Sequence, residues 1–130
     1  MSAWDPTTAA RLTAPEEVRV ATARRDGSLR RPRIIWDVAV GHRVFVRSTN
    51  GRGADWFRAA IATGRGRIEG GGAAYDVVFV DAAEGDLPGV DAAYRTKYGA
   101  YAAIVDHLLG PGPRAATLEV LPAIDPTPPR

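Results

Sequence analysis

The 130-residue sequence contains no cysteine, a single methionine and a single lysine, and only two histidines. Without cysteine, disulfide bonds, thiolate nucleophiles and cysteine-ligated metals are all excluded. The two imidazoles, His42 and His107, do not stand at a metal-ligand spacing, so we expect no metal site. No serine has a recognisable histidine partner either. If the protein is an enzyme, we therefore expect its chemistry to belong to a bound organic cofactor.

Long apolar runs are also lacking, so the sequence predicts no membrane-spanning segment. The first six residues lack the basic and apolar parts of a signal peptide, and we expect a cytoplasmic protein. Seventeen basic and 15 acidic residues give a net charge of +2. The arginines are scattered, with Arg24-Arg25 and Arg30-Arg31-Pro32-Arg33 as the densest runs. Because no predicted helix carries a basic face, we expect no nucleic-acid partner.

The length indicates one domain. We expect a helical segment over residues 1–16, a barrel domain over residues 17–122 and a flexible, proline-rich tail over residues 123–130. A barrel of this size has little room to enclose a large cofactor alone, which favours a homodimer.

Hydrophobic alternation and turn residues predict the secondary structure. Strands are expected over residues 18–22, 34–40, 44–47, 75–80 and 116–121, with a further strand starting near residue 67. Helices are expected over residues 5–12, 56–62 and 91–109. Asp26-Gly27 is a hairpin signal, so the first three strands are expected to form an antiparallel meander. This order of elements indicates an α+β barrel, mostly antiparallel, with flanking helices.

The stretch from Arg47 to Trp56 joins the third predicted strand to a helix and combines arginines, small polar residues and two glycines. Outward-facing N–H groups at a helix start, with glycines that permit close approach and arginine forks, are typical of an anion cradle. The same stretch also fits an ordinary strand–turn–helix connection with solvated arginines. The sequence alone leaves both interpretations open.

Three tyrosines of the predicted long helix, Tyr94, Tyr98 and Tyr101, have the spacing of one helix face. They form either a core stripe or, in part, the wall of a pocket beside a flat ring. Trp36 and Trp56 face the same choice between core packing and contact with such a ring.

A family resemblance is visible when these pieces are taken together. The residues that carry it are Ile35-Trp36, Val46-Arg47-Ser48, the turn from Gly51 to Trp56, the segment from Asp91 to Gly99, and the segment from Thr117 to Pro122. Over most of its length the chain resembles the flavin-binding split-barrel superfamily, which includes pyridoxamine phosphate oxidases and deazaflavin-dependent nitroreductases. Within that group it is most similar to an uncharacterised bacterial family. The resemblance implies a mostly antiparallel split β-barrel, the FMN-binding split barrel, with flanking helices.

The resemblance also implies site residues. Those implied to bind the cofactor are Arg24, Arg25, Ile35, Trp36, Arg47, Ser48, Gly51, Arg52 and Trp56. On the substrate side the implied candidates are Lys97, Tyr98 and Tyr101. Thr49 stands where the nitroreductase branch has a lysine, and Arg47 and Arg52 could supply the missing charge.

The function implied is a flavin- or deazaflavin-dependent oxidoreductase that transfers hydride to a small organic substrate. The cofactor would be FMN or a deazaflavin coenzyme of the F-420 type, held between the subunits of a homodimer. Two alternatives remain open on the same fold: a non-catalytic protein that binds a flavin or related anion, and a dimeric structural or interaction module.

Overall fold

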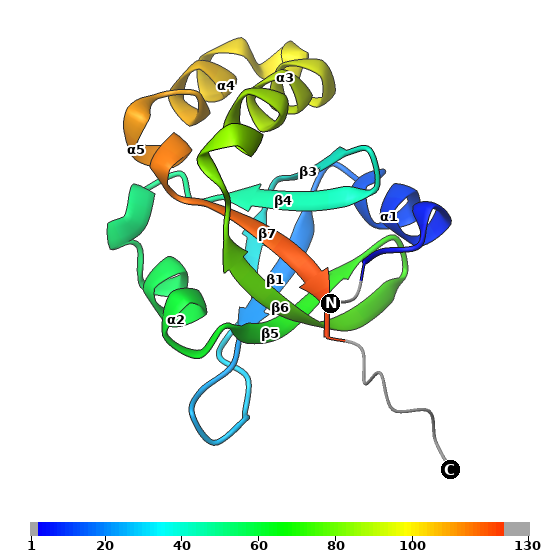
Figure 1. The fold of residues 1–130 in the computed structure, drawn as a ribbon, viewed down its shortest axis with the longest axis vertical. Helices are drawn as coiled ribbons and strands as arrows, with labels where there is room; N and C mark the ends of the chain where they lie inside the picture. The colour runs from blue at the N-terminus through cyan, green and yellow to red at the C-terminus, as the bar shows by residue number, and fades with distance from the viewer. Residues whose placement is uncertain (1–2, 124–130) are drawn as a thin grey trace.

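The computed structural model describes residues 3–123, so nearly all of the expected tail, residues 123–130, lies outside the described residues. The described chain is an α+β fold in which seven antiparallel strands form a nearly closed barrel with five flanking helices (Figure 1). This architecture confirms the predicted antiparallel barrel with flanking helices.

The two edges of the nearly closed barrel are connected through the chain itself. Its strands are β1 (Val18–Thr22), β2 (Arg33–Ile35), β3 (Asp37–Val40), β4 (Arg43–Arg47), β5 (Arg65–Gly70), β6 (Ala73–Asp81) and β7 (Thr117–Pro122). They are hydrogen-bonded in the order β2-β1-β5-β6-β7-β4-β3. The two end strands, β2 and β3, follow each other in the chain with only Trp36 between them. One continuous segment therefore joins the two edges of the sheet.

The prediction of a single strand over residues 34–40 is wrong, because this segment forms two strands, β2 and β3. Ile35 pairs with Val18 on β1, whereas Asp37 pairs with Val46 on β4. The segment changes partner at Trp36, so the first strands form two hairpins rather than one meander. The sequence pattern did not reveal the change because apolar residues alternate without interruption through Trp36.

The helices also differ from the predicted pattern. They are α1 (Pro6–Thr13), α2 (Asp55–Thr63), α3 (Leu87–Lys97), α4 (Ala102–Leu108) and α5 (Pro111–Ala115), with short 3-10 turns at η1 (Gly51–Gly53), η2 (Glu84–Asp86) and η3 (Gly99–Tyr101). The expected helix 91–109 starts earlier and is interrupted where Tyr98 leaves helical geometry, at φ −115° and ψ 24°. Gly99, a weak helix former, follows. Among residues 3–123, no helix combines the length and apolar character needed to cross a membrane.

A tight turn between β5 and β6 contacts the N-terminal helix. Gly71 and Gly72 adopt φ values of 62° and 84°, the left-handed geometry of a two-residue hairpin turn. A Cβ atom at Gly71 would collide with the backbone oxygen of Arg11 in α1. This close approach requires glycine, and it fixes α1 against the end of the β5–β6 hairpin.

Two hydrophobic cores lie on the two faces of β4. Val44 and Val46 point into the barrel interior, where they join Phe57 of α2. Phe45 points outward and joins Val38 and the buried residues of α3 and α4. Figure 1 shows α3 and α4 together on the side of the barrel formed by β3 and β4. Since α3 packs directly on β3, it is anchored beside the point where the chain changes partner.

Candidate ligand-binding site

Two clefts adjoin at the end of β2. The first, called here the arginine cleft, has a volume of about 540 Å³ and is lined by four arginines together with Asp55 and Trp56. The second, called here the apolar cleft, has a volume of about 450 Å³. Its apolar lining residues are Ile34, Ile35, Trp36, Trp56, Ile104 and Leu108. Arg33 and Trp56 line both clefts, so the two form one composite surface.

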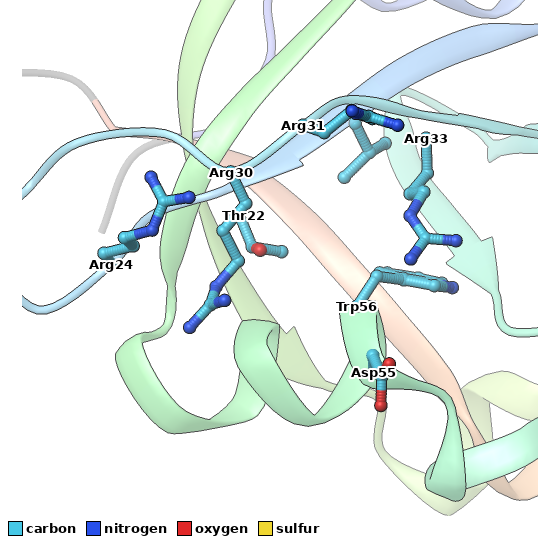
Figure 2. A pocket seen from close by; sticks show the side chains of 8 residues that line it. Thr22, Arg24, Arg30, Arg31, Arg33, Asp55 and Trp56 are labelled. Carbon is cyan, nitrogen blue, oxygen red and sulfur yellow. The ribbon is translucent and has the colours of Figure 1, made fainter.

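The arginine cleft is built by the connection between β1 and β2. That connection supplies Arg24, Arg30 and Arg31, and the first residue of β2 is the fourth arginine, Arg33. Figure 2 shows the guanidinium group of Arg33 above the indole of Trp56, which projects from the first turn of α2. The cleft thus combines an indole surface from α2 with a guanidinium group from β2.

The charge of this cleft is largely uncompensated. Within residues 3–123, the side chains of Arg30, Arg31 and Arg33 form no ion pair, and Arg24 donates only to neutral oxygens of Ser28 and Leu29, at 3.3 and 2.9 Å. The one acid of the cleft, Asp55, pairs with Arg58 at 2.9 Å. A cleft with surplus guanidinium groups attracts phosphate or carboxylate groups.

The apolar cleft has an aromatic wall. The indole of Trp36 is stacked on the ring of Tyr98, with 4.0 Å between centroids and an interplanar angle of 1°. Glu17, Thr49 and Asn50 supply polar groups elsewhere on its lining. At the edge of the cleft, Ile34 and Ile104 are 61% and 45% exposed. Apolar walls with a few polar groups are typical of sites for organic ligands.

The residues implied by the resemblance are only partly brought together here. Arg24 and Trp56 line the arginine cleft, and Ile35, Trp36, Arg47 and Trp56 line the apolar cleft. Arg25 lies exposed at the tip of the β1–β2 connection. The tip turn is held by hydrogen bonds from Gly27 N to Arg24 O and from Ser28 N to Asp26 Oδ1, both 2.9 Å long, which confirms the predicted turn.

The guanidinium group of Arg47 is buried and occupied by protein partners. Its Nε donates to Thr117 Oγ1 at 2.8 Å, and its Nη1 donates to Leu108 O at 3.0 Å. Its Nη2 lies 2.6 Å from Asp91 Oδ1, an ion pair that lacks hydrogen-bond alignment. These contacts tie β4 to β7, α3 and α4. Arg47 is therefore a core cation at the floor of the apolar cleft, with its donors turned toward the protein.

The turn that follows β4 is also engaged internally. Ser48 is fully buried, and its Oγ has no hydrogen-bond partner within residues 3–123. Gly51 adopts φ 74° against the backbone of Gly112. Arg52 forms a two-pronged contact with Asp81 at 2.9 and 3.1 Å. Gly51 and Arg52 of the expected anion cradle are thus engaged by the protein itself, whereas the buried Ser48 hydroxyl is not.

The three substrate-side candidates lie behind or beside the aromatic wall. Tyr98 is 1% exposed, and its hydroxyl donates to the backbone oxygens of Glu16 and Asp37, at 2.6 and 3.1 Å. Burial raises the pKa of the Tyr98 hydroxyl above its ordinary value. Lys97 forms an ion pair with Asp37 at 2.9 Å. Tyr101 is 41% exposed, and its hydroxyl donates to the Glu16 carboxylate at 2.6 Å.

Three arginines that the sequence reasoning did not select, Arg30, Arg31 and Arg33, line the arginine cleft. Their signal was visible, because they form the densest basic run of the sequence. The run faces a tryptophan that lies more than twenty positions away in the chain, and only the fold brings the two together. Among residues 3–123, no cluster of three or more His, Asp or Glu side chains has a geometry that could hold a metal ion.

Comparisons with known proteins place the chain in a family. Residues 8–120 match the model of DUF2255, a family of uncharacterised proteins conserved in bacteria, and the chain belongs to this family. No curated protein matches the sequence. Among solved structures, the conserved hypothetical protein Rv2991 from Mycobacterium tuberculosis is similar, with a TM-score of 0.58 and 13% identity over 90% of this chain and 78% of that one. This likeness extends to the fold.

Proposed function

We propose that this member of the DUF2255 family binds an anionic, planar cofactor of the flavin or deazaflavin class across its two clefts and acts as an oxidoreductase on a small organic substrate. The observation that carries the proposal is the junction of the clefts. Arg33 and Trp56 line both, so an anionic tail among the arginines lies next to a ring among aromatic side chains. The resemblance to the flavin-binding split-barrel superfamily supports the same class of ligand.

The residues of the composite surface fit such a ligand. Arg30, Arg31 and Arg33 would hold a phosphate or carboxylate group through charge-assisted hydrogen bonds. Trp36 and Trp56 would contact the ring by stacking or at its edge, and burial of the ring against them would exclude water. This assignment moves the anion-binding role from Arg47, whose donors are occupied by the protein, to arginines that form no ion pair within residues 3–123.

The cofactor would supply hydride transfer, and the protein would supply binding and orientation. Thr49 and Asn50 are uncharged polar residues of the apolar cleft, and they would orient a substrate or a ring substituent by hydrogen bonding. Tyr98 would support the indole of Trp36 rather than contact the substrate, because its hydroxyl is already bonded to two backbone oxygens.

A homodimer belongs to this proposal. Ile34, Tyr101 and Ile104 are large apolar side chains that are 61%, 41% and 45% exposed, and two of them line the apolar cleft. A second copy packed on this edge would enclose the ring, which a barrel of this size leaves open to solvent. Light scattering at micromolar concentration should give the dimer mass for the wild type and a lower mass for Ile34→Glu. A monomeric wild type, with and without cofactor, would contradict the dimer.

The test of binding is a spectroscopic titration of the purified protein with FMN and with an F-420-type deazaflavin. Arg33→Gln should weaken binding of the accepted cofactor about 10- to 100-fold, because a charge-assisted hydrogen bond contributes about 1.5–3 kcal/mol. The matched control is Arg95→Gln, an exposed arginine of α3 that lines neither cleft. Equal losses in the two variants would indicate only a general effect of charge, and absence of any binding would refute the proposal.

Turnover separates the oxidoreductase from the alternative of a non-catalytic carrier. With cofactor bound, reduction by a nicotinamide donor for a flavin, or addition of the reduced deazaflavin, should be followed by reoxidation on adding a nitro or quinone test substrate. A protein that binds the cofactor tightly but does not accelerate this reoxidation would be a carrier or sensor.

A further inference from the structure

The backbone at the change of sheet partner is held by side chains of α3 and of Tyr98, the residue that follows α3. Tyr94 donates its hydroxyl to Trp36 O at 2.9 Å. Lys97 Nζ and the Tyr98 hydroxyl donate to Asp37 O, at 2.7 and 3.1 Å. The two carbonyls next to the break therefore receive bonds from the helix. Because Trp36 is the residue between the two strands, these contacts determine where its indole lies.

A buried carboxylate stands at the centre of this arrangement. Asp37 is 0% exposed, and its Oδ1 accepts from Lys97 at 2.9 Å. Its Oδ2 has no hydrogen-bond partner within residues 3–123. A buried charge with one oxygen unpaired is costly, so the pair with Lys97 carries most of the compensation. The side chain of Lys97 remains 20% exposed and can reach water if the pair is lost.

We propose that the Asp37–Lys97 ion pair is a positioning pair for Trp36, and that neutralisation of the carboxylate releases the aromatic wall of the apolar cleft. The ion pair is connected to the indole of Trp36 in two ways. Asp37 follows Trp36 in the chain, and Lys97 precedes Tyr98, whose ring is stacked on the indole at 4.0 Å. Loss of the pair removes a donor from Asp37 O and loosens the end of α3 that carries the stacking partner.

Proton uptake by Asp37 is the natural trigger. Burial raises the pKa of its carboxyl to about 6, although Lys97 opposes the rise. The other titratable or charged groups nearby are Tyr94 on α3 and Tyr98 directly after it, whose hydroxyls stay neutral because burial raises both pKa values. They are joined by the Glu16 carboxylate, the Arg47 guanidinium and Glu17, which lines the apolar cleft together with Trp36. Below pH 6 the pair loses its anion, and a ligand held against Trp36 should bind more weakly.

The test uses the full chain labelled with 5-fluorotryptophan, which gives one 19F resonance for each of Trp4, Trp36 and Trp56. The resonance that is missing from the spectrum of Trp36→Phe is assigned to Trp36. The resonances of Trp4 and Trp56 serve as internal references. In the wild type we expect the Trp36 resonance to titrate with a midpoint near pH 6, and in Asp37→Asn we expect no such titration. A flat Trp36 resonance between pH 4.5 and 8 in the wild type would overturn the proposal.

A second variant keeps the test decisive if Asp37→Asn fails to fold. Lys97→Gln removes the cation that favours the charged carboxylate, so the Trp36 midpoint should move upward by about one pH unit. His107→Gln controls for the imidazole that contacts Thr49 O at the same cleft, and it should leave the midpoint unchanged. A midpoint that follows His107 and ignores Lys97 would assign the effect to the histidine and refute the positioning pair.

The consequence for ligand binding rests on the proposed function, whereas the 19F titration needs no ligand. If the cofactor fails to bind but Trp36 titrates with Asp37, the positioning pair stands and the cofactor proposal fails. If the cofactor binds but Trp36 does not respond, the positioning proposal alone fails.

Discussion

Arg47→Ala is expected to destabilise the protein rather than to remove a ligand contact. The substitution deletes a side chain that is 0% exposed and that bonds Thr117 Oγ1 and Leu108 O. It also removes the ion-pair partner of Asp91. The elements that meet at this guanidinium, β4, β7, α3 and α4, would lose their common polar contact.

The size of the effect can be worked from these contacts. Breaking a buried ion pair by removing one partner costs about 3–5 kcal/mol, chiefly because a charge is left uncompensated. Asp91 keeps a second cation, Arg114, at 2.9 Å, and its side chain is 14% exposed, which reduces the penalty. Leu108 O loses its donor as well. We therefore expect a loss of about 3–4 kcal/mol, a large part of the stability of a domain of this size.

Urea denaturation measures this loss, with Arg33→Ala as the matched comparison. Arg33 has an exposed side chain without an ion pair within residues 3–123, so its removal should change the free energy of unfolding by no more than about 0.5 kcal/mol. Arg47→Met, which retains most of the volume, should also be destabilised, which would attribute the loss to polar contacts. A change below about 1 kcal/mol for Arg47→Ala would refute the reasoning.

Three further variants test the arrangement around Trp36 and the turn between β5 and β6. Tyr98→Phe should cost about 1 kcal/mol in urea denaturation, because Glu16 O loses its bond from the hydroxyl, whereas Asp37 O keeps the one from Lys97 Nζ. Asp37→Asn should alter the pH dependence of stability. Since folding raises the pKa of Asp37 from 3.8 to about 6, its contribution is complete below pH 3.8 and falls by about 3 kcal/mol as the pH rises through 6, so the wild type should lose stability relative to the variant across this window. Gly71→Ala should lower the melting temperature, whereas Gly27→Ala, also at positive φ but with open space around its Cβ position, should have a smaller effect.

Most of the fold was predictable because its signals are local. Alternating apolar residues located the strands, and Asp26-Gly27 located a turn. The break at Trp36 was not predictable, because the same alternation serves β2 and β3 while their partners differ. The interruption at Tyr98 was missed for a related reason: its side chain has the spacing of a helix face, and its backbone departs from the helix where its ring packs on Trp36.

The site was less predictable, because charge alone does not reveal whether an arginine is buried. Arg47 ends a strand whose outward face is covered by α3 and α4, so its side chain is enclosed, as is that of Phe45 two positions earlier. Arg33 starts an edge strand, and its side chain reaches a cleft. Sequence motifs favoured Arg47 because it adjoins a glycine-rich turn. Which of the two arginines is buried and which is available to a ligand depends on the layer of helices over β4, and this layer is known only from the fold.

Barrel closure and the candidate site depend on one short segment. β2 carries Arg33 at its first residue, and Trp36 directly follows its last residue, so the cationic and aromatic parts of the composite surface are three positions apart. β2 and β3 are the end strands of the sheet, so each has only one neighbouring strand. Where the segment changes from one neighbour to the other, α3 donates hydrogen bonds to the carbonyl oxygens of Trp36 and Asp37. Substitutions in α3 should therefore disturb the aromatic wall before they disturb the barrel. The position of Trp56, which lies on the separate helix α2, should not change. The Trp36 and Trp56 sides of the composite surface can therefore be perturbed independently.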